Sequence, residues 1–184
     1  KEKVPPAGAA AGEWPAVTRA RKMLVLEGCA QPSLSPATNA AAARVLDRLG
    51  ISLVRATGAG CCGAVSFHLN QQERALDVMR RTIDAWWPHI EHGAEAIVIT
   101  ASGCGVTVKE YGHHLAQDPA SAAKAKRVSE LAKDIGEVIA AESAKLKPLA
   151  KAQQVAFHSP CTLQHGMKLK GKVESLLAAH EQQA

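Results

Sequence analysis

The sequence predicts an α/β fold, a parallel-sheet layered domain with helical crossovers and with cysteines at the carboxyl ends of its strands. Short apolar runs alternate with longer stretches of helical periodicity along the 184 residues. This alternation is typical of parallel strands joined by right-handed crossovers. Cysteines follow the apolar runs, near the start of the next helical stretch. In an open parallel sheet, ligand sites form along that edge.

Strands are expected at the apolar runs 22–27, 51–56, 96–100 and 154–158. Helices are expected at 36–49, 69–90, 106–115, 121–141 and 172–180. Ser35 and Pro36 give a start signal for the first helix, and Gly50 gives its end. The long helix carries apolar residues at steps of three, four and seven, which define one buried face. Pro88 is expected to kink it and Gly93 to close it.

Composition excludes several classes of protein. Apolar residues make up 47% and charged residues 21%, with a net charge of +5, which is typical of a globular domain. The basic residues are mixed with acidic ones and aromatics reach only 3%, so no nucleic-acid partner is expected. No apolar run reaches the roughly 20 residues of a transmembrane segment. No secretory signal is visible either, and a start at Lys1 suggests a piece of a longer chain.

The five cysteines occupy one kind of position in the sequence. Each follows a predicted strand and is flanked by small residues; they are Cys29, Cys61, Cys62, Cys104 and Cys161. Thiolates at helix N-termini are stabilised by free N–H groups, and neighbouring glycines let those groups approach. The alternative is that each is a small buried hydrophobe. The adjacent Cys61 and Cys62 fit that alternative poorly, because neighbouring thiols cannot fill the same core pocket.

A disulfide framework is not expected from these cysteines. Their number is odd and the chain is not small. With no secretory signal, this indicates a reducing, cytoplasmic compartment.

Residues 58–63 (GAGCCG) match the G-x-G-x-x-G dinucleotide fingerprint after a predicted strand. That fingerprint requires an acidic residue at the end of the next strand, about 20 positions further on. Asp77 and Asp84 fall inside the long predicted helix instead. A nicotinamide site is therefore not favoured.

The histidines and carboxylates suggest no catalytic residue. His158 and His165 flank Cys161 and could ligate a metal beside it, and His113 and His114 follow Cys104. Without a supporting motif, surface or capping roles are favoured for these histidines. No paired carboxylates and no Ser-His-Asp arrangement can be identified.

The order of the cysteines, Cys…Cys-Cys-Gly…Cys, resembles the cysteine-rich CCG domain family. This family includes the B subunit of heterodisulfide reductase and the iron–sulfur subunits of respiratory 2-hydroxy-acid dehydrogenases. The resemblance is strongest to the C-terminal part of bacterial glycolate oxidase iron–sulfur subunits. It covers about residues 13–180 and includes the strings LEGCAQPSLSPATNAAAARVLDRLGI, GAGCCGAVSFHL, AWWPHIEHGAEAIVITASGCGVTVKEYGHHL and VAFHSPCTLQHG.

The resemblance implies an iron–sulfur cluster, most simply 4Fe-4S, held by Cys29, Cys61, Cys62 and Cys104. The family motif ends in C-x-x-C, whereas this chain has Ala101 at the first of those two positions. That departure favours a four-thiolate site over the five-cysteine cluster of the heterodisulfide reductase relatives.

The resemblance also implies an organisation and a function. Residues 1–20 would be an arm or linker, 21–150 a first CCG domain and 151–184 the start of a truncated second repeat opened by Cys161. The chain would be the electron-transfer subunit of a glycolate or 2-hydroxy-acid dehydrogenase, relaying electrons from flavin subunits toward the quinone pool. It would lie in the cytoplasm, with the complex at the cytoplasmic face of the inner membrane. Alone, the chain would be inactive.

Two alternatives remain open at the level of sequence. The same cysteines could hold zinc in a closed structural site, which would make the chain a docking domain. The chain could also fold without any metal, with five free thiols.

Overall fold

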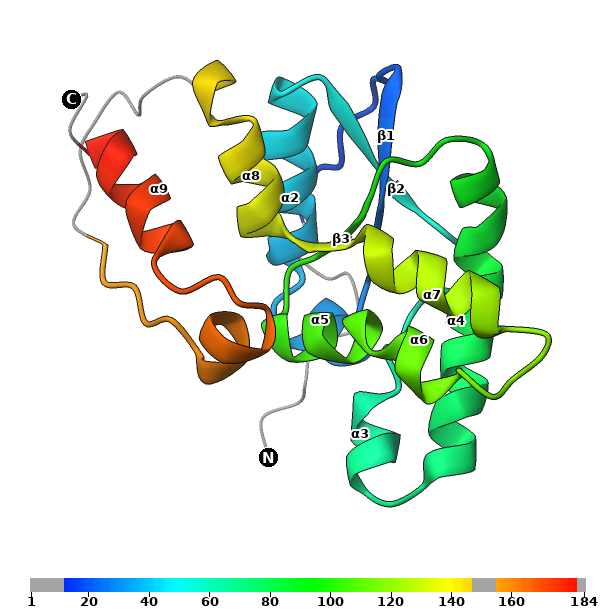
Figure 1. Cartoon of the computed structure of the whole chain (residues 1–184). Helices are drawn as coiled ribbons and strands as arrows, with labels where there is room; N and C mark the ends of the chain where they lie inside the picture. The colour runs from blue at the N-terminus through cyan, green and yellow to red at the C-terminus, as the bar shows by residue number, and fades with distance from the viewer. Residues whose placement is uncertain (1–11, 147–154, 182–184) are drawn as a thin grey trace.

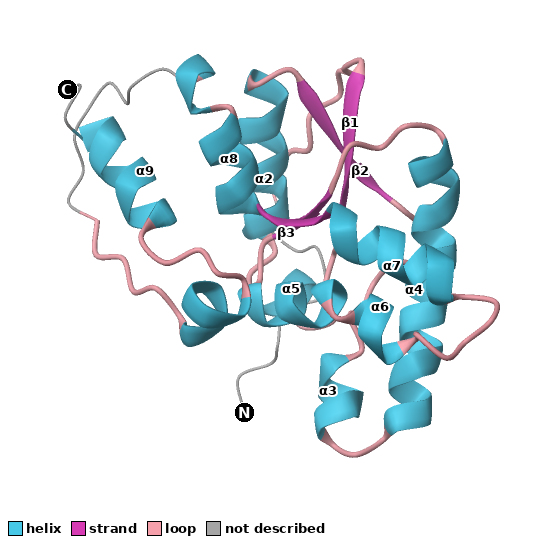
Figure 2. Cartoon of the chain, in the orientation of Figure 1, coloured by secondary structure: helices cyan, strands magenta, loops and turns pink. Residues whose placement is uncertain are grey.

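The computed structural model describes residues 12–146 and 155–181. Within these residues four parallel strands form one sheet in the order β2-β1-β3-β4. The strands are β1 (Arg21–Val25), β2 (Ile51–Arg55), β3 (Ile97–Ile99) and β4 (Ala132–Asp134). Figure 2 shows the strands in the middle of the molecule with helices on either side. The predicted α/β class with a parallel sheet is confirmed.

Helices cover both faces of the sheet, so the fold has three layers (Figure 1). The helices are α1 (Gln31–Leu34), α2 (Ala37–Arg48), α3 (Ala64–His68), α4 (Gln72–Glu91), α5 (Ser102–Lys109), α6 (Tyr111–His114), α7 (Ala122–Leu131), α8 (Ile135–Ala141) and α9 (Lys172–Glu181). Two short helical turns, η1 (Ser143–Lys145) and η2 (Thr162–Gly166), complete the elements. None of the helices in the described ranges is both long and apolar enough to cross a bilayer.

The two faces of the sheet bury separate apolar cores. On the face of α2 and α8, Val25 and Val98 pack with Leu46. On the opposite face, Leu24 and Ile97 pack with the helices α4 and α7. Residues of both faces are buried because both are covered, which explains why residues 23–26 and 97–99 are continuous apolar runs. The strand predictions at 22–27, 51–56 and 96–100 are confirmed to within two residues at each end.

The prediction of a fourth strand at 154–158 is wrong. Residues 155–158 form no strand, and residue 154 lies outside the described part of the chain. Val155 and Phe157 are 55% and 40% exposed, since no neighbouring strand pairs with this segment. The fourth strand is β4, which interrupts the helix predicted over 121–141 and divides it into α7 and α8.

A capping box explains where α8 begins. The Asp134 carboxylate accepts a hydrogen bond from the Gly136 N–H at 2.8 Å, and the Glu137 carboxylate accepts one from the Asp134 N–H at 2.9 Å. This reciprocal pair stops a continuous helix from running through Asp134, because the N-cap residue has extended backbone geometry.

The remaining helix predictions are confirmed in outline. The long helix is α4, which keeps Pro88 inside it, whereas Leu69 lies in the turn before it. Trp86 is buried in the core and Trp87 donates a hydrogen bond to Glu91 at 2.8 Å.

Of the predicted arm 1–20, residues 1–11 lie outside the described residues. Trp14 donates to the Leu53 carbonyl at 3.2 Å and stacks against Arg55, so it fixes the chain against β2.

Candidate iron–sulfur site

Three strand-to-helix turns meet at the carboxyl edge of the sheet. Cys29 follows β1, the doublet Cys61–Cys62 follows β2, and Cys104 lies in the first turn of α5 after β3. The strand β1 stands between β2 and β3 in the sheet, and the connections on its two sides run over opposite faces. Such a reversal of strand order opens a crevice at the carboxyl ends of the strands. We call the group formed by Cys29, Cys61, Cys62 and Cys104 the cysteine edge.

The four cysteines of this edge lie close enough to influence one another and form two pairs. Burial, followed by the neighbouring Cys61 thiol, raises the pKa of Cys29, and the thiols of Cys62 and Cys104 shift each other's pKa values. The charge of Cys62 also acts to raise the pKa of Cys29, and the charges of Cys29 and Cys61 act to raise that of Cys104. The sequence prediction that these distant cysteines converge is thus supported by the arrangement of the folded chain.

The environment separates the pKa values of the second pair. The hydrogen bond with Cys104, followed by burial, strongly raises the pKa of Cys62, which is only 3% exposed. The same hydrogen bond lowers the pKa of Cys104, because the thiol of Cys62 donates to the Cys104 thiolate. Within this pair, Cys104 is therefore the thiol that loses its proton more readily.

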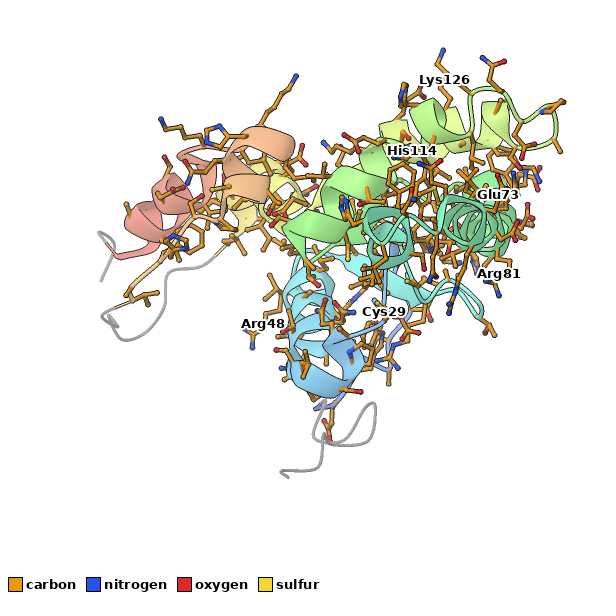
Figure 3. All side chains as sticks on the ribbon, turned by 90° about the horizontal axis from the view of Figure 1, so that it is seen from below. Cys29, Arg48, Glu73, Arg81, His114 and Lys126 are labelled. Atoms are coloured by element: carbon orange, nitrogen blue, oxygen red, sulfur yellow. The ribbon has the colours of Figure 1, made fainter. Side chains whose placement is uncertain are left out.

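A cavity of about 560 Å³ lies over the cysteine edge. All four cysteines line it, together with residues of α1, α3 and the turn into α5. Figure 3 looks at the molecule from below and shows Cys29 near the centre of the view, beside the blue α1–α2 region. The apolar side chains Leu34 and Val65 stand at this cavity and are 73% and 62% exposed.

Backbone N–H groups face the sulfurs of the doublet. The Gly63 N–H donates to the Cys61 sulfur at 3.4 Å, and the N–H of Ala64 acts to lower the pKa of Cys62, against the effect of burial. Gly63 has a φ of +85°, and a Cβ there would lie 3.1 Å from the Ala75 carbonyl oxygen. Only glycine can therefore occupy this turn without strain. N–H donors of this kind stabilise thiolates and the sulfur atoms of a cluster.

A buried polar network, which sequence reasoning missed, supports the turn after β1. Gln31 donates to Thr100 at 2.7 Å and to Asn39 at 3.0 Å, and Thr100 donates to Asn39 at 2.7 Å. Asn39 in turn donates to the carbonyls of Leu26 and Glu27 at 3.4 Å. This network links the turns that carry Cys29 and Cys104. No sequence motif marks these residues, because their partners meet only in the folded chain.

Cys161 lies apart from the cysteine edge. It is exposed, stands at the start of η2 and does not line the cavity. Residues 159–173, here the Cys161 segment, pack against α5 through a small core of Leu163, Met167 and Leu169. Ser102 and Thr162 share a hydrogen bond of 2.7 Å across this contact.

The histidines form no site of their own. His158 and His165 are exposed beside Cys161, and His113 is exposed on α6. The ring of His114 lies 4.4 Å from that of Phe67, and burial lowers its pKa. Among the described residues, no group of three or more His, Cys, Asp or Glu side chains could hold a single metal ion. Tetrahedral zinc, with Zn–S bonds of about 2.3 Å, needs all ligands around one point, whereas these sulfurs stand in two pairs.

Residues 23–109 match the family model described as CCG, a cysteine-rich domain. The matched stretch contains the whole cysteine edge. This part of the chain is therefore similar to CCG cysteine-rich domains.

The relatives define the resemblance further. The chain is 55% identical, over 96% of its length, to the glycolate oxidase iron–sulfur subunit of Escherichia coli, of which it covers 44%. It is 24% identical to the probable glycolate oxidase iron–sulfur subunit of Bacillus subtilis, with 85% of this chain and 35% of that protein covered. Lactate utilization protein A of Bacillus licheniformis is 25% identical over 73% of this chain and 54% of its own length. The chain thus spans less than half of the two glycolate oxidase subunits. No solved structure matches.

Proposed function

We propose that this chain is part of an electron-transfer iron–sulfur subunit, and that Cys29, Cys61, Cys62 and Cys104 hold its cluster. The observation that carries the proposal is the meeting of these four cysteines at one edge of the sheet. The 55% identity to a glycolate oxidase iron–sulfur subunit supports it independently.

The donor set fits an iron–sulfur cluster better than a single ion. A cluster contains several irons, so its thiolate ligands stand further apart than those around one zinc. Four cysteines in two pairs around one cavity meet that requirement. Four thiolates can hold either a 2Fe-2S or a 4Fe-4S cluster, and the resemblance to the CCG family favours the 4Fe-4S type. When bound, the cluster would accept and release single electrons.

The residues of the chain would act by holding and tuning this group. The Gly63 N–H would donate to the Cys61 sulfur, as it does in the structure. Donors of this type and exclusion of water set the potential of a cluster. We assign no catalytic acid, base or nucleophile to the chain.

The larger system is part of the same proposal. As part of a glycolate oxidase, the subunit would receive electrons from flavin-containing subunits and relay them toward the quinone pool. It would lie in the cytoplasm, at the cytoplasmic face of the inner membrane through its complex. The chain by itself would not oxidise glycolate or another 2-hydroxy acid.

We also propose a division of the chain, with an arm at 1–20, the first CCG domain at 21–150 and the start of a second repeat at 151–184. Cys161 stands just before the helical turn η2, as Cys29 stands just before α1, which supports the comparison between the two segments.

The test is a metal and sulfide analysis of the chain after anaerobic reconstitution with iron and sulfide. We expect iron and acid-labile sulfide in matching amounts and a broad visible absorption that dithionite bleaches. Zinc without sulfide would instead support a structural docking domain. Five titratable thiols without any metal would contradict both assignments.

A further inference from the structure

The backbone of the cysteine doublet is held from beneath by two buried hydroxyl groups. Thr82 of α4 donates a hydrogen bond to the carbonyl oxygen of Cys61 at 2.9 Å, and Tyr111 of α6 donates one to that of Cys62, also at 2.9 Å. Thr82 is 1% exposed and Tyr111 is fully buried.

These hydrogen bonds answer a need created by the doublet itself. For both sulfurs to reach one cavity from adjacent positions, the backbone must turn, which directs its carbonyls into the core. Among the described residues, no backbone N–H donates to either carbonyl. A buried carbonyl without a donor is destabilising, so the two hydroxyls stabilise this conformation of the turn.

The two sulfurs of the doublet belong to different pairs, so its backbone geometry decides both. Cys61 faces Cys29, whereas Cys62 faces Cys104. A rotation of either peptide would move one sulfur relative to its partner in another turn. The hydroxyls come from α4 and α6, outside the three turns that carry the cysteines, so they fix the doublet to the rigid core.

We infer that Thr82 and Tyr111 are positioning residues of the sulfur site, which set the directions of the Cys61 and Cys62 sulfurs through their carbonyls. This inference rests on the proposed iron–sulfur function. Both residues lie outside the cysteine motif, and their hydroxyls bind the backbone carbonyls of the cysteines.

The experiment compares Thr82→Val and Tyr111→Phe with two controls. Both variants remove one hydroxyl and retain an apolar side chain of similar shape. Thr82→Ser keeps the hydroxyl and should restore wild-type behaviour. Ser129→Ala removes a hydroxyl that donates to the Val108 carbonyl at 3.0 Å and accepts from the Gly112 N–H at 3.0 Å, and that binds neither carbonyl of the doublet.

Two readouts are needed. The first is the rate of iron release from the reconstituted chain to a chelator, which should rise about tenfold or more in Thr82→Val and Tyr111→Phe, as expected when second-layer support is lost. The second is the rate at which iodoacetamide modifies Cys61 and Cys62 in the cluster-free chain, measured by peptide mass spectrometry. It should rise by a similar factor of about ten, because loss of a hydrogen bond to a buried carbonyl makes opening of the turn easier.

Rates indistinguishable from wild type in both variants would overturn the inference. Equal acceleration in Ser129→Ala would overturn it too, because it would indicate general loosening of the fold. If the wild-type chain takes up no cluster, the proposed function fails, and the alkylation rates alone decide whether the hydroxyls position the doublet.

Discussion

The cysteine edge and the Cys161 segment start from the same sequence pattern and reach different structures. At the cysteine edge, three turns at the carboxyl ends of an open parallel sheet bring four cysteines around one cavity. In the Cys161 segment, a single exposed cysteine opens a helical turn, and residues 155–160 directly before it form no strand. The comparison teaches that the motif becomes a site through the sheet, because neighbouring strands supply the second, third and fourth sulfur.

The largest expected effect comes from removing a sulfur from each region. Cys62→Ser should abolish the visible absorption and the bound iron and sulfide of the reconstituted chain, because a buried ligand is lost. Cys161→Ser should leave all three unchanged. Equal loss in both variants would mean that the two regions do not differ in the proposed way.

The second effect concerns glycines of left-handed conformation in the two regions. Gly63→Ala combines a φ of +85° with a Cβ 3.1 Å from a backbone oxygen and should reduce the free energy of unfolding by about 2–4 kcal/mol. Gly171→Ala, at a φ of +78° with open space around it, should cost about 1–2 kcal/mol from backbone strain alone. Urea unfolding followed by circular dichroism measures both, and a larger loss at Gly171 would reverse the comparison.

A third pair of variants compares the hydrogen bonds that support each region. Asn39→Ala removes a side chain that is 8% exposed and bonded to Gln31 and Thr100, so it should cost about 1–3 kcal/mol of unfolding free energy. Thr162→Val breaks the exposed contact with Ser102 and should change stability by about 0.5 kcal/mol or less. Similar losses in urea titrations would show that the Cys161 segment is held as firmly as the cysteine edge.

The smallest effect is a pH dependence at an ion pair between α4 and the connection from α6 to α7. The guanidinium of Arg80 donates to Asp118 at 2.6 Å and holds the pKa of that carboxyl below its usual range. Its contribution to stability is complete above the unfolded value of about 3.9 and is lost as the pH falls through the folded pKa. The thermal midpoints of wild type and Arg80→Gln should differ at neutral pH and converge as the pH falls through the lowered pKa of Asp118 in the folded chain. A difference that persists unchanged in acid would point to packing of the Arg80 side chain instead.

The elements that could be predicted from the sequence are those whose own residues are mostly apolar and therefore buried. The strands β1, β2 and β3 are apolar runs and were expected within two residues at each end. The strand β4, with the sequence AKD, has no such run. The spacing of Asp134 and Glu137 is typical of a capping box, and it was the available signal that a helix starts after Asp134. The segment 155–158 has strand-forming residues but no neighbouring strand to pair with, so local preference misled.

The candidate site divides in the same way. Its cysteines could be predicted, because their place after strands puts them on one edge of a parallel sheet. The supporting residues could not. Asn39, Thr82 and Tyr111 look like ordinary helix residues in the sequence, and their role depends on carbonyl groups 12 to 49 positions away along the chain.

The spread of the four sulfurs over three separate crossovers ties cofactor loading to the order of folding. Thirty-one residues lie between Cys29 and Cys61, and forty-one between Cys62 and Cys104. In an unfolded or partly folded chain these thiols lie too far apart to bind the same cluster together. In the proposed site, a cluster that bridges all four sulfurs would require the central strands to be paired, and the loaded centre would stabilise that pairing by mass action. Chelation would then weaken the whole three-layer architecture, including helices that never touch a sulfur.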